Sequence, residues 1–166
     1  RESPDWLKQR LAAVGLRPIS ALVDITNYMS QTYARPLHVF DAAKLSGGIT
    51  VRESAGGERL AALDGKTYTL PAGVTLIADD AKPLAIAGII GGAESGCTPE
   101  TTEVILEAAL FDAAAIARAG QKLEIFSDAR ARFERGVDPE FVKDGAGVAA
   151  RMILELCGGE IVGWAE

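Results

Sequence analysis

The chain contains few of the side chains that most often perform catalysis or bind metals. It has one histidine, His38, and two cysteines, Cys97 and Cys157, among 166 residues. These residues do not have the spacing of a zinc site, and the chain has no HExxH helix. The cysteines also form no evident disulfide framework, so we expect a reducing, cytoplasmic environment. The composition argues against a metal hydrolase and leaves only a weak case for a Ser, His and Asp arrangement.

Long apolar runs and excess positive charge are also missing. No hydrophobic run is long enough to cross a bilayer, so we expect no membrane partner. The first residues, Arg1 to Asp5, contain neither an initiator methionine nor a signal peptide, which predicts a segment of a longer polypeptide. The net charge of −6 excludes a surface that wraps a long stretch of nucleic acid. Any contact with nucleic acid is expected to be small and local.

One segment departs from this acidity. Between residues 118 and 135 five basic side chains accompany three acidic ones, leaving an excess of two positive charges; the basic ones are Arg118, Lys122, Arg130, Arg132 and Arg135. Such a pattern is typical of a solvated helix surface with internal ion pairs. The same pattern also suits a local basic patch, and the sequence leaves both interpretations open.

Length and periodicity predict an α+β fold in which a mostly antiparallel or mixed β-sheet core is flanked by helices. A hydrophobic content of 48% is enough for one domain, expected over residues 1–166, or for two small lobes. Ser3 and Pro4 are typical of a helix start, with Ser3 as the capping residue. Spacing and turn signals predict further helices at residues 20–33, ending at Pro36, and at 112–122, 128–135 and 139–157.

The middle of the chain has the shorter period of β-strands. Residues 59–63 and 67–70 flank Asp64-Gly65 and predict a hairpin. Further strands are predicted at residues 49–53, 74–78, 84–90 and 104–110. Because the helices and strands do not alternate regularly, the pattern favours α+β over βαβ units.

Three polar residues near the N-terminus are the first candidates for a site. His38 is the only side chain of the histidine type, whose ordinary pKa lies near neutral pH, and Thr26 and Asn27 interrupt the middle of a predicted helix. A lone histidine is either structural or catalytic, and polar residues in a helix are either exposed or functional. The residues alone do not decide between these alternatives.

Two further features lie in the predicted strands. The segment from Ala87 through Gly88 and Gly91 to Gly92 is either a tight turn or a backbone wall that a ligand approaches closely. Glu107 lies among apolar neighbours, and strict alternation places it with Ile105 and Ala109 rather than with water. A buried carboxylate is costly without a partner, so Glu107 either faces solvent or points into a polar pocket.

An ordered set of short motifs spans nearly the whole chain; its segments are residues 17–20, 23–28 (VDITNY), 36–41 (PLHVFD), 63–65, 87–92, 106–109 and 132–139 (RFERGVDP). This set resembles the B3/B4 region of bacterial-type phenylalanyl-tRNA synthetase β subunits. The resemblance implies an editing domain, an ester hydrolase within phenylalanine–tRNA ligase that removes tyrosine from mischarged tRNA(Phe). The alternative is a module that binds the tRNA end or a protein without hydrolysis.

The resemblance also implies the roles of individual residues. Glu107 accepts a hydrogen bond from the tyrosine hydroxyl, and Ala87, Gly88 and Gly91 lie against the ring and the ester. The family's pattern places Thr26, Asn27 and His38 near the scissile ester and the terminal adenosine. Ser127 and Ala129 line the opposite wall.

The chemistry implied by the resemblance needs no metal or cofactor, whereas ATP and magnesium act at another site of the parent synthetase. A positioned water attacks the ester, and His38 holds either that water or the ribose. The implied partners are the 3′ end of tRNA(Phe) and, through the parent β subunit, the synthetase α subunit. Two positions depart from the family's pattern: Arg130 stands where serine is common, and Val39 stands where alanine is frequent.

Overall fold

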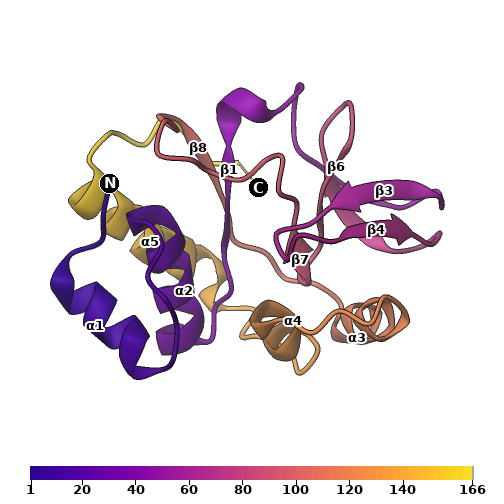
Figure 1. Cartoon of the computed structure of the whole chain (residues 1–166), viewed down its shortest axis with the longest axis horizontal. Helices are drawn as coiled ribbons and strands as arrows, with labels where there is room; N and C mark the ends of the chain where they lie inside the picture. The colour runs from indigo at the N-terminus through magenta and orange to yellow at the C-terminus, as the bar shows by residue number, and fades with distance from the viewer. Residues whose placement is uncertain (166) are drawn as a thin grey trace. The chain divides into compact units, whose positions relative to one another are not determined.

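A computed structural model of the chain describes residues 1–165. The fold divides into two compact units, which are described separately here (Figure 1). The first unit comprises Arg1–Val39, Leu106–Ala108 and residues from Asp138 onward, and the second comprises Phe40–Ile105 and Ala109–Val137. Each unit has its own hydrophobic core. Helices and antiparallel strands confirm the predicted α+β class.

The first unit is built from helices α1 (Asp5–Ala13), α2 (Ala21–Tyr33) and α5 (Phe141–Cys157). Their apolar residues recur every three or four positions, so each helix turns one stripe inward. The stripes meet in a core whose fully buried members are Leu7, Leu11, Ile25, Met29 and Ala149. The predicted helices over residues 20–33 and 139–157 are thus confirmed within two residues.

The start of α1 corrects one expectation. Pro4, not Ser3, occupies the N-cap position, and no side chain caps this helix. The Ser3 hydroxyl instead donates to Asp24 Oδ2 at 2.5 Å, and Asp24 Oδ1 accepts from the backbone N–H of Ile19 at 2.9 Å. Both side chains are buried, so Asp24 connects the N-terminal segment to the entrance of α2. This long-range pairing left no local signal in the sequence.

The second helix ends before the proline that was expected to terminate it. Ala34 adopts a left-handed conformation with φ of 50° directly after Tyr33, and its N–H bonds back to the Met29 carbonyl. Pro36 lies two residues further on, and strand β1 (His38–Asp41) begins after it. The sequence did not predict β1, because four residues carry too little periodicity to identify a strand.

Strand β1 forms a two-stranded sheet with β8 (Val104–Glu107). The expectation of a strand over residues 104–110 is wrong at its C-terminal end, because β8 stops at Glu107. The predicted alternation is wrong as well: Ile105 is exposed, whereas Leu106 packs against the core of the first unit. The boundary between the units falls after Val39 in β1 and after Ile105 in β8.

The second unit contains an antiparallel sheet in the order β2–β5–β6–β7 and a separate hairpin. The sheet strands are β2 (Thr50–Glu53), β5 (Thr75–Ala78), β6 (Pro83–Ile86) and β7 (Ile90–Gly91), and the hairpin strands are β3 (Glu58–Ala61) and β4 (Thr67–Leu70). Arg59 pairs with Thr69 in the hairpin, which confirms the predicted turn around Asp64-Gly65. A short 3₁₀ helix, η1 (Ala42–Lys44), follows β1.

The single strand predicted over residues 84–90 is two strands. β6 ends at Ile86 and β7 begins at Ile90, with a turn between them in which Gly88 has a φ of 65°. Apolar side chains on both sides of the turn gave the sequence the appearance of one continuous strand. Glycine adopts this backbone conformation without the steric penalty of a Cβ atom.

Helices α3 (Ala113–Lys122) and α4 (Asp128–Phe133) complete the second unit. They contribute Ile116 and Phe133 to a core that also contains Leu76 and Ile86 from the sheet, with Ile125 from the segment between the helices. Both helices start at the predicted places, and α4 ends two residues earlier than expected. Within residues 1–165, no helix combines the length and the apolar character needed to cross a bilayer.

Candidate functional site

Glu107 is the last residue of β8, in the first unit. Its side chain is partly buried, and this burial raises the pKa of its carboxyl from 4.5 to about 7. Desolvation disfavours the charged form of a carboxyl, and here it is the cause of the shift. Glu107 is therefore a titratable acceptor that is partly shielded from bulk solvent.

His38 is the first residue of β1, the strand that pairs with β8. Burial lowers the pKa of its imidazole from 6.5 to about 4, so the side chain is neutral near pH 7. Its Nε2 atom is out of contact with solvent. A neutral imidazole has one donor and one acceptor nitrogen, which suits it to orient a hydroxyl group or a water molecule. The pairing of β1 with β8 joins the strands that carry His38 and Glu107, and both residues belong to the first unit.

Thr26 and Asn27 lie in the middle of α2, also in the first unit, and both are partly buried. The Thr26 hydroxyl donates to the carbonyl of Val23 at 2.8 Å. A threonine in a helix often uses its hydroxyl in this way, so the hydroxyl must turn away from the helix before it can donate to a ligand. The three residues expected near the ester and Glu107, expected at the tyrosine hydroxyl, therefore belong to one compact unit.

The remaining predicted residues lie in the second unit. Ser127 caps α4 by accepting from the N–H of Arg130 at 3.0 Å, and its hydroxyl donates to the Ile89 carbonyl at 2.5 Å. Through these two hydrogen bonds, Ser127 connects the start of α4 to the turn that contains Gly88. The structure thus places Ser127 directly beside the glycine turn, and the expectation that the two line opposite walls of a site stays a prediction.

Packing explains why the turn requires glycine. A Cβ atom on Gly88 would lie 2.9 Å from Phe111 Cδ2, 3.0 Å from Ile116 Cδ1 and 3.1 Å from Phe133 Cδ2. The vacant side-chain position of Gly88 therefore faces the hydrophobic core. A role of the Gly88 backbone toward a ligand stays a prediction.

Ala87, Gly91 and Ala129 are held by the fold of the second unit. Ala87 is 1% exposed and packs with Phe40 and Leu84. The carbonyl of Gly91 accepts from the N–H of Leu63 at 3.0 Å. Ala129 packs against the larger core of this unit. Packing accounts for small side chains at Ala87 and Ala129. The proposed contact of all three residues with substrate stays a prediction.

One buried charged residue was overlooked in the sequence. Arg35 is 1% exposed, and its guanidinium donates to the carbonyl of Asp138. It also passes close to Gly145 of α5, where a Cβ atom would lie 3.1 Å from Arg35 Cγ. Arg35 thereby connects the end of α2 to the segment before α5 within the first unit. Its place directly before Pro36 and near His38 could have marked Arg35 as a candidate, but no local sequence pattern indicates that its side chain is buried.

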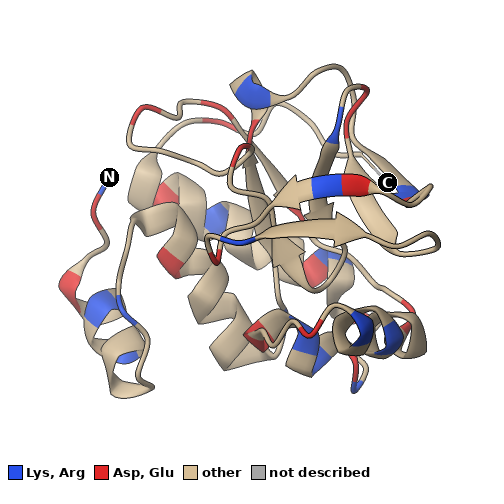
Figure 2. Cartoon of the chain, turned by 45° about the vertical axis from the view of Figure 1, so that its right-hand side comes forward, with Lys and Arg blue, Asp and Glu red and all other residues tan. Residues whose placement is uncertain are grey.

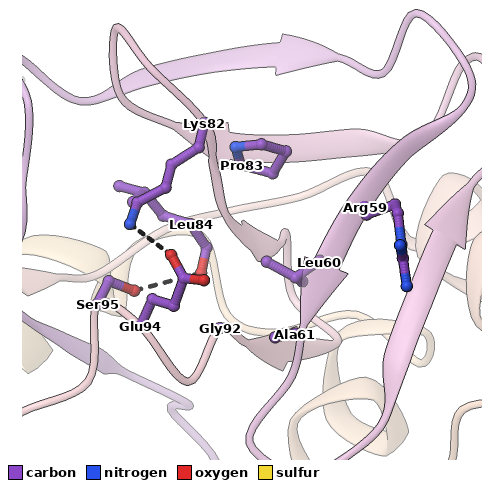
Figure 3. A pocket seen from close by; sticks show the side chains of 9 residues that line it. All are labelled: Arg59, Leu60, Ala61, Lys82, Pro83, Leu84, Gly92, Glu94 and Ser95. Carbon is purple, nitrogen blue, oxygen red and sulfur yellow. Dashed lines mark hydrogen bonds and ion pairs between the residues drawn. The ribbon is translucent and has the colours of Figure 1, made fainter.

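The second unit also has a small cavity of about 160 Å³ beside β3 and β6 (Figure 3). Lys82 points across it to Glu94, with an N–O distance of 2.6 Å, and the Ser95 hydroxyl lies 3.4 Å from the Leu84 carbonyl. Of the residues considered for the site, only Gly92, at the end of the glycine segment, lines this cavity. The described residues also contain no group of three or more metal-ligating side chains.

The comparisons with known proteins agree with the motifs. A family model described as the B3/4 domain matches residues 1–158. A phenylalanine–tRNA ligase beta subunit from Paramagnetospirillum magneticum is 63% identical over 159 residues, which cover 96% of this chain and 20% of that protein. The subunit of the same name from Cereibacter sphaeroides is 62% identical over 158 residues, covering 95% of this chain and 20% of that protein.

The sequence identity is high over nearly the whole chain. A further relative with the same name, from Brucella suis, is 56% identical over 158 residues, covering 95% of this chain and 20% of that protein. The chain spans about a fifth of the length of the curated relatives it matches. The resemblance that was read from the motifs is confirmed. Because the family model covers all but the last eight residues, the chain belongs to the B3/4 domain family.

Proposed function

We propose that this chain is the editing region of a phenylalanine–tRNA ligase β subunit and hydrolyses the ester of Tyr-tRNA(Phe). The observation that carries the proposal is the pairing of β1 with β8, which joins the strand that begins at His38 to the strand that ends at Glu107. A carboxyl with a raised pKa and a neutral imidazole are thereby held in one unit. Perturbed titratable groups of this kind are typical of functional sites.

Glu107 supplies the selectivity in this proposal. A pocket shaped for phenylalanine does not strongly reject tyrosine, because the two differ only by an added hydroxyl. A buried hydrogen-bond acceptor discriminates between the two. The tyrosine hydroxyl donates a hydrogen bond to it, whereas phenylalanine leaves the acceptor without a partner. Because burial has already removed part of the water around Glu107, a phenol that donates to it adds a hydrogen bond at a reduced desolvation cost.

The hydrolytic step requires orientation more than proton abstraction. An aminoacyl ester is already activated, so a held water and donors aimed at the oxyanion are sufficient. With a pKa of about 4, His38 is a weak base at neutral pH, but its neutral imidazole binds a water or a ribose hydroxyl well. Thr26 and Asn27 provide further polar groups in the same unit.

The partners follow from the relatives' name. We propose that the chain works in the cytoplasm as part of a ligase with an α subunit, and that the 3′ end of tRNA(Phe) enters its site. The acidic chain does not oppose this, because a single-stranded end needs only a small contact surface. Binding of ATP and magnesium, and the aminoacylation itself, belong to another part of the ligase.

The proposal is tested by deacylation with the complete ligase. Purified Tyr-tRNA(Phe) and Phe-tRNA(Phe) are each incubated with the wild type, with His38→Ala and with Lys66→Ala, an exposed control in the β3–β4 turn. We expect rapid release of tyrosine, slow release of phenylalanine, a rate reduced at least tenfold in His38→Ala, and no change in Lys66→Ala.

Two results would overturn the proposal in different ways. Equal rates in the wild type and His38→Ala would remove this histidine from the reaction. Binding of the tRNA end without release of tyrosine would identify the chain as a noncatalytic binding module.

A further inference from the structure

Phe126 is an exposed aromatic side chain with no role in the proposed hydrolysis. It lies in the segment between α3 and α4 and is 88% exposed, whereas Phe40 and Phe133 of the same unit are buried. It is also the one large apolar side chain that is exposed between residues 113 and 135. An exposed phenylalanine does not contribute to the hydrophobic core. A role in binding must therefore be sought in the residues around it.

The ring of Phe126 lies against a fixed cation. The guanidinium carbon of Arg130 is 5.3 Å from the centroid of the ring. Arg130 is held in place by Glu134 Oε2 at 2.9 Å and by the Ile125 carbonyl at 2.6 Å. Its side chain also packs over Gly120 of α3, where a Cβ atom would lie 2.3 Å from Arg130 Nε. One side of the ring thus has a rigid partner, while most of the residue's surface is open to solvent.

The two helices beside Phe126 carry positive charge on an otherwise acidic chain (Figure 2). On α4, Arg130 and Arg132 are engaged with Glu134 and Asp128, as expected for a solvated helix surface with internal ion pairs. On α3, the exposed cations Arg118 and Lys122 have no acidic partner within ion-pair distance among the described residues. The interpretation as a solvated surface with internal ion pairs therefore fits α4, and the interpretation as a local basic patch fits α3.

We propose that Phe126 and the exposed cations of α3 form a contact site for unpaired nucleotides of RNA, distinct from the residues assigned to hydrolysis. A base stacks on the open side of the Phe126 ring, and Arg118 and Lys122 attract the neighbouring phosphates. The proposal rests on the proposed function in that the RNA is the 3′ strand of tRNA. It also gives a role to Arg130, which departs from the family's common residue.

The charge around Phe126 favours RNA over a protein partner. A protein interface of useful size has a core of several apolar side chains surrounded by a polar rim. The segment from residue 118 to 135 instead presents one exposed aromatic ring among five basic and three acidic side chains, an excess of two positive charges on an otherwise acidic chain. A nucleobase and its phosphates complement such a ring and such charges, and stacking on an aromatic side chain requires no particular base.

The test compares two RNAs on the complete ligase. One is intact, deacylated tRNA(Phe), and the other is the same tRNA without its unpaired 3′ nucleotides. We expect Phe126→Ala to weaken binding of the intact tRNA about tenfold and to leave binding of the shortened tRNA unchanged. Phe126→Trp preserves the stacking surface and the affinity, and Ile19→Ala, which removes another exposed apolar side chain, changes neither.

Salt dependence tests the cations separately. The double variant Arg118→Ala with Lys122→Ala lowers the slope of log affinity against log salt concentration by about one for intact tRNA. Equal losses for both RNAs in Phe126→Ala, or no loss for either, would overturn the proposal. A defect confined to assembly of the ligase subunits would overturn it in favour of a protein contact. If tyrosine is not released but the two RNAs still differ, the hydrolytic function fails and this inference stands.

Discussion

Replacing Glu107 with glutamine removes a carboxyl whose pKa burial raises to about 7. In the unfolded chain this group has its ordinary pKa of 4.5, so the folded state binds its proton more tightly. A group with a raised folded pKa contributes stability below pH 4.5, and this contribution is lost as the pH rises through 7. Glutamine does not ionise, so Glu107→Gln is expected to avoid that loss.

The difference between 4.5 and about 7 corresponds to about 3 kcal/mol of unfolding free energy. We therefore expect Glu107→Gln to gain stability relative to the wild type by up to about 3 kcal/mol between pH 4.5 and pH 8. Urea unfolding at several pH values measures the gain. His38, whose lowered pKa makes its contribution disappear as the pH falls from 6.5 to 4, is present in both proteins and cancels.

A neighbour on the same strand provides the control. Ile105→Val alters an exposed, uncharged side chain of β8 and should change stability by the same amount at every pH. If Glu107→Gln and the wild type also differ by a constant amount from pH 4.5 to pH 8, Glu107 ionises as it does in the unfolded chain. The burial of its carboxylate would then be refuted.

Three further predictions concern the turn, the cap and the pH profile. Gly88→Ala should destabilise the chain by about 2–4 kcal/mol in urea unfolding, because it adds a Cβ both at positive φ and against the core; a loss below about 0.5 kcal/mol would contradict this packing. Ser127→Ala should cost about 1–2 kcal/mol in the same assay, through loss of the α4 cap and of the bond to Ile89, and an unchanged midpoint would argue against both bonds. In a plot of the rate of tyrosine release against pH, we expect an inflection near pH 7 that comes from Glu107, because His38 stays neutral above about pH 4. The inflection should persist in His38→Gln and disappear in Glu107→Gln, and the opposite pattern would reverse the two assignments.

The sequence predicted the elements whose signals are local. The helix over residues 20–33 and the hairpin around Asp64-Gly65 follow from periodicity and from a turn dipeptide, and both are present. Strand β1 was missed because its partner β8 lies more than 60 residues away along the chain. The strand predicted over residues 84–90 was wrong because the turn at Gly88 lies between two apolar segments.

In the candidate site, too, the sequence predicted what depends on local chemistry and missed what depends on distant contacts. His38 and Glu107 were identified as candidates by their chemistry, but neither the pairing of their strands nor the direction of their pKa shifts follows from local pattern. Alternation was misleading at Glu107, since the strand ends there and Ile105 faces solvent. Arg35 was overlooked because a buried arginine depends on a distant carbonyl, that of Asp138.

The central claim, that Glu107 distinguishes tyrosine from phenylalanine, is tested most directly by one ratio. The ratio is kcat/KM for deacylation of Tyr-tRNA(Phe) divided by that for Phe-tRNA(Phe), measured with the complete ligase at pH 8. We expect Glu107→Ala to lower this ratio by about 10- to 100-fold, the value of a hydrogen bond to a charged group. An unchanged ratio in Glu107→Ala would contradict the account.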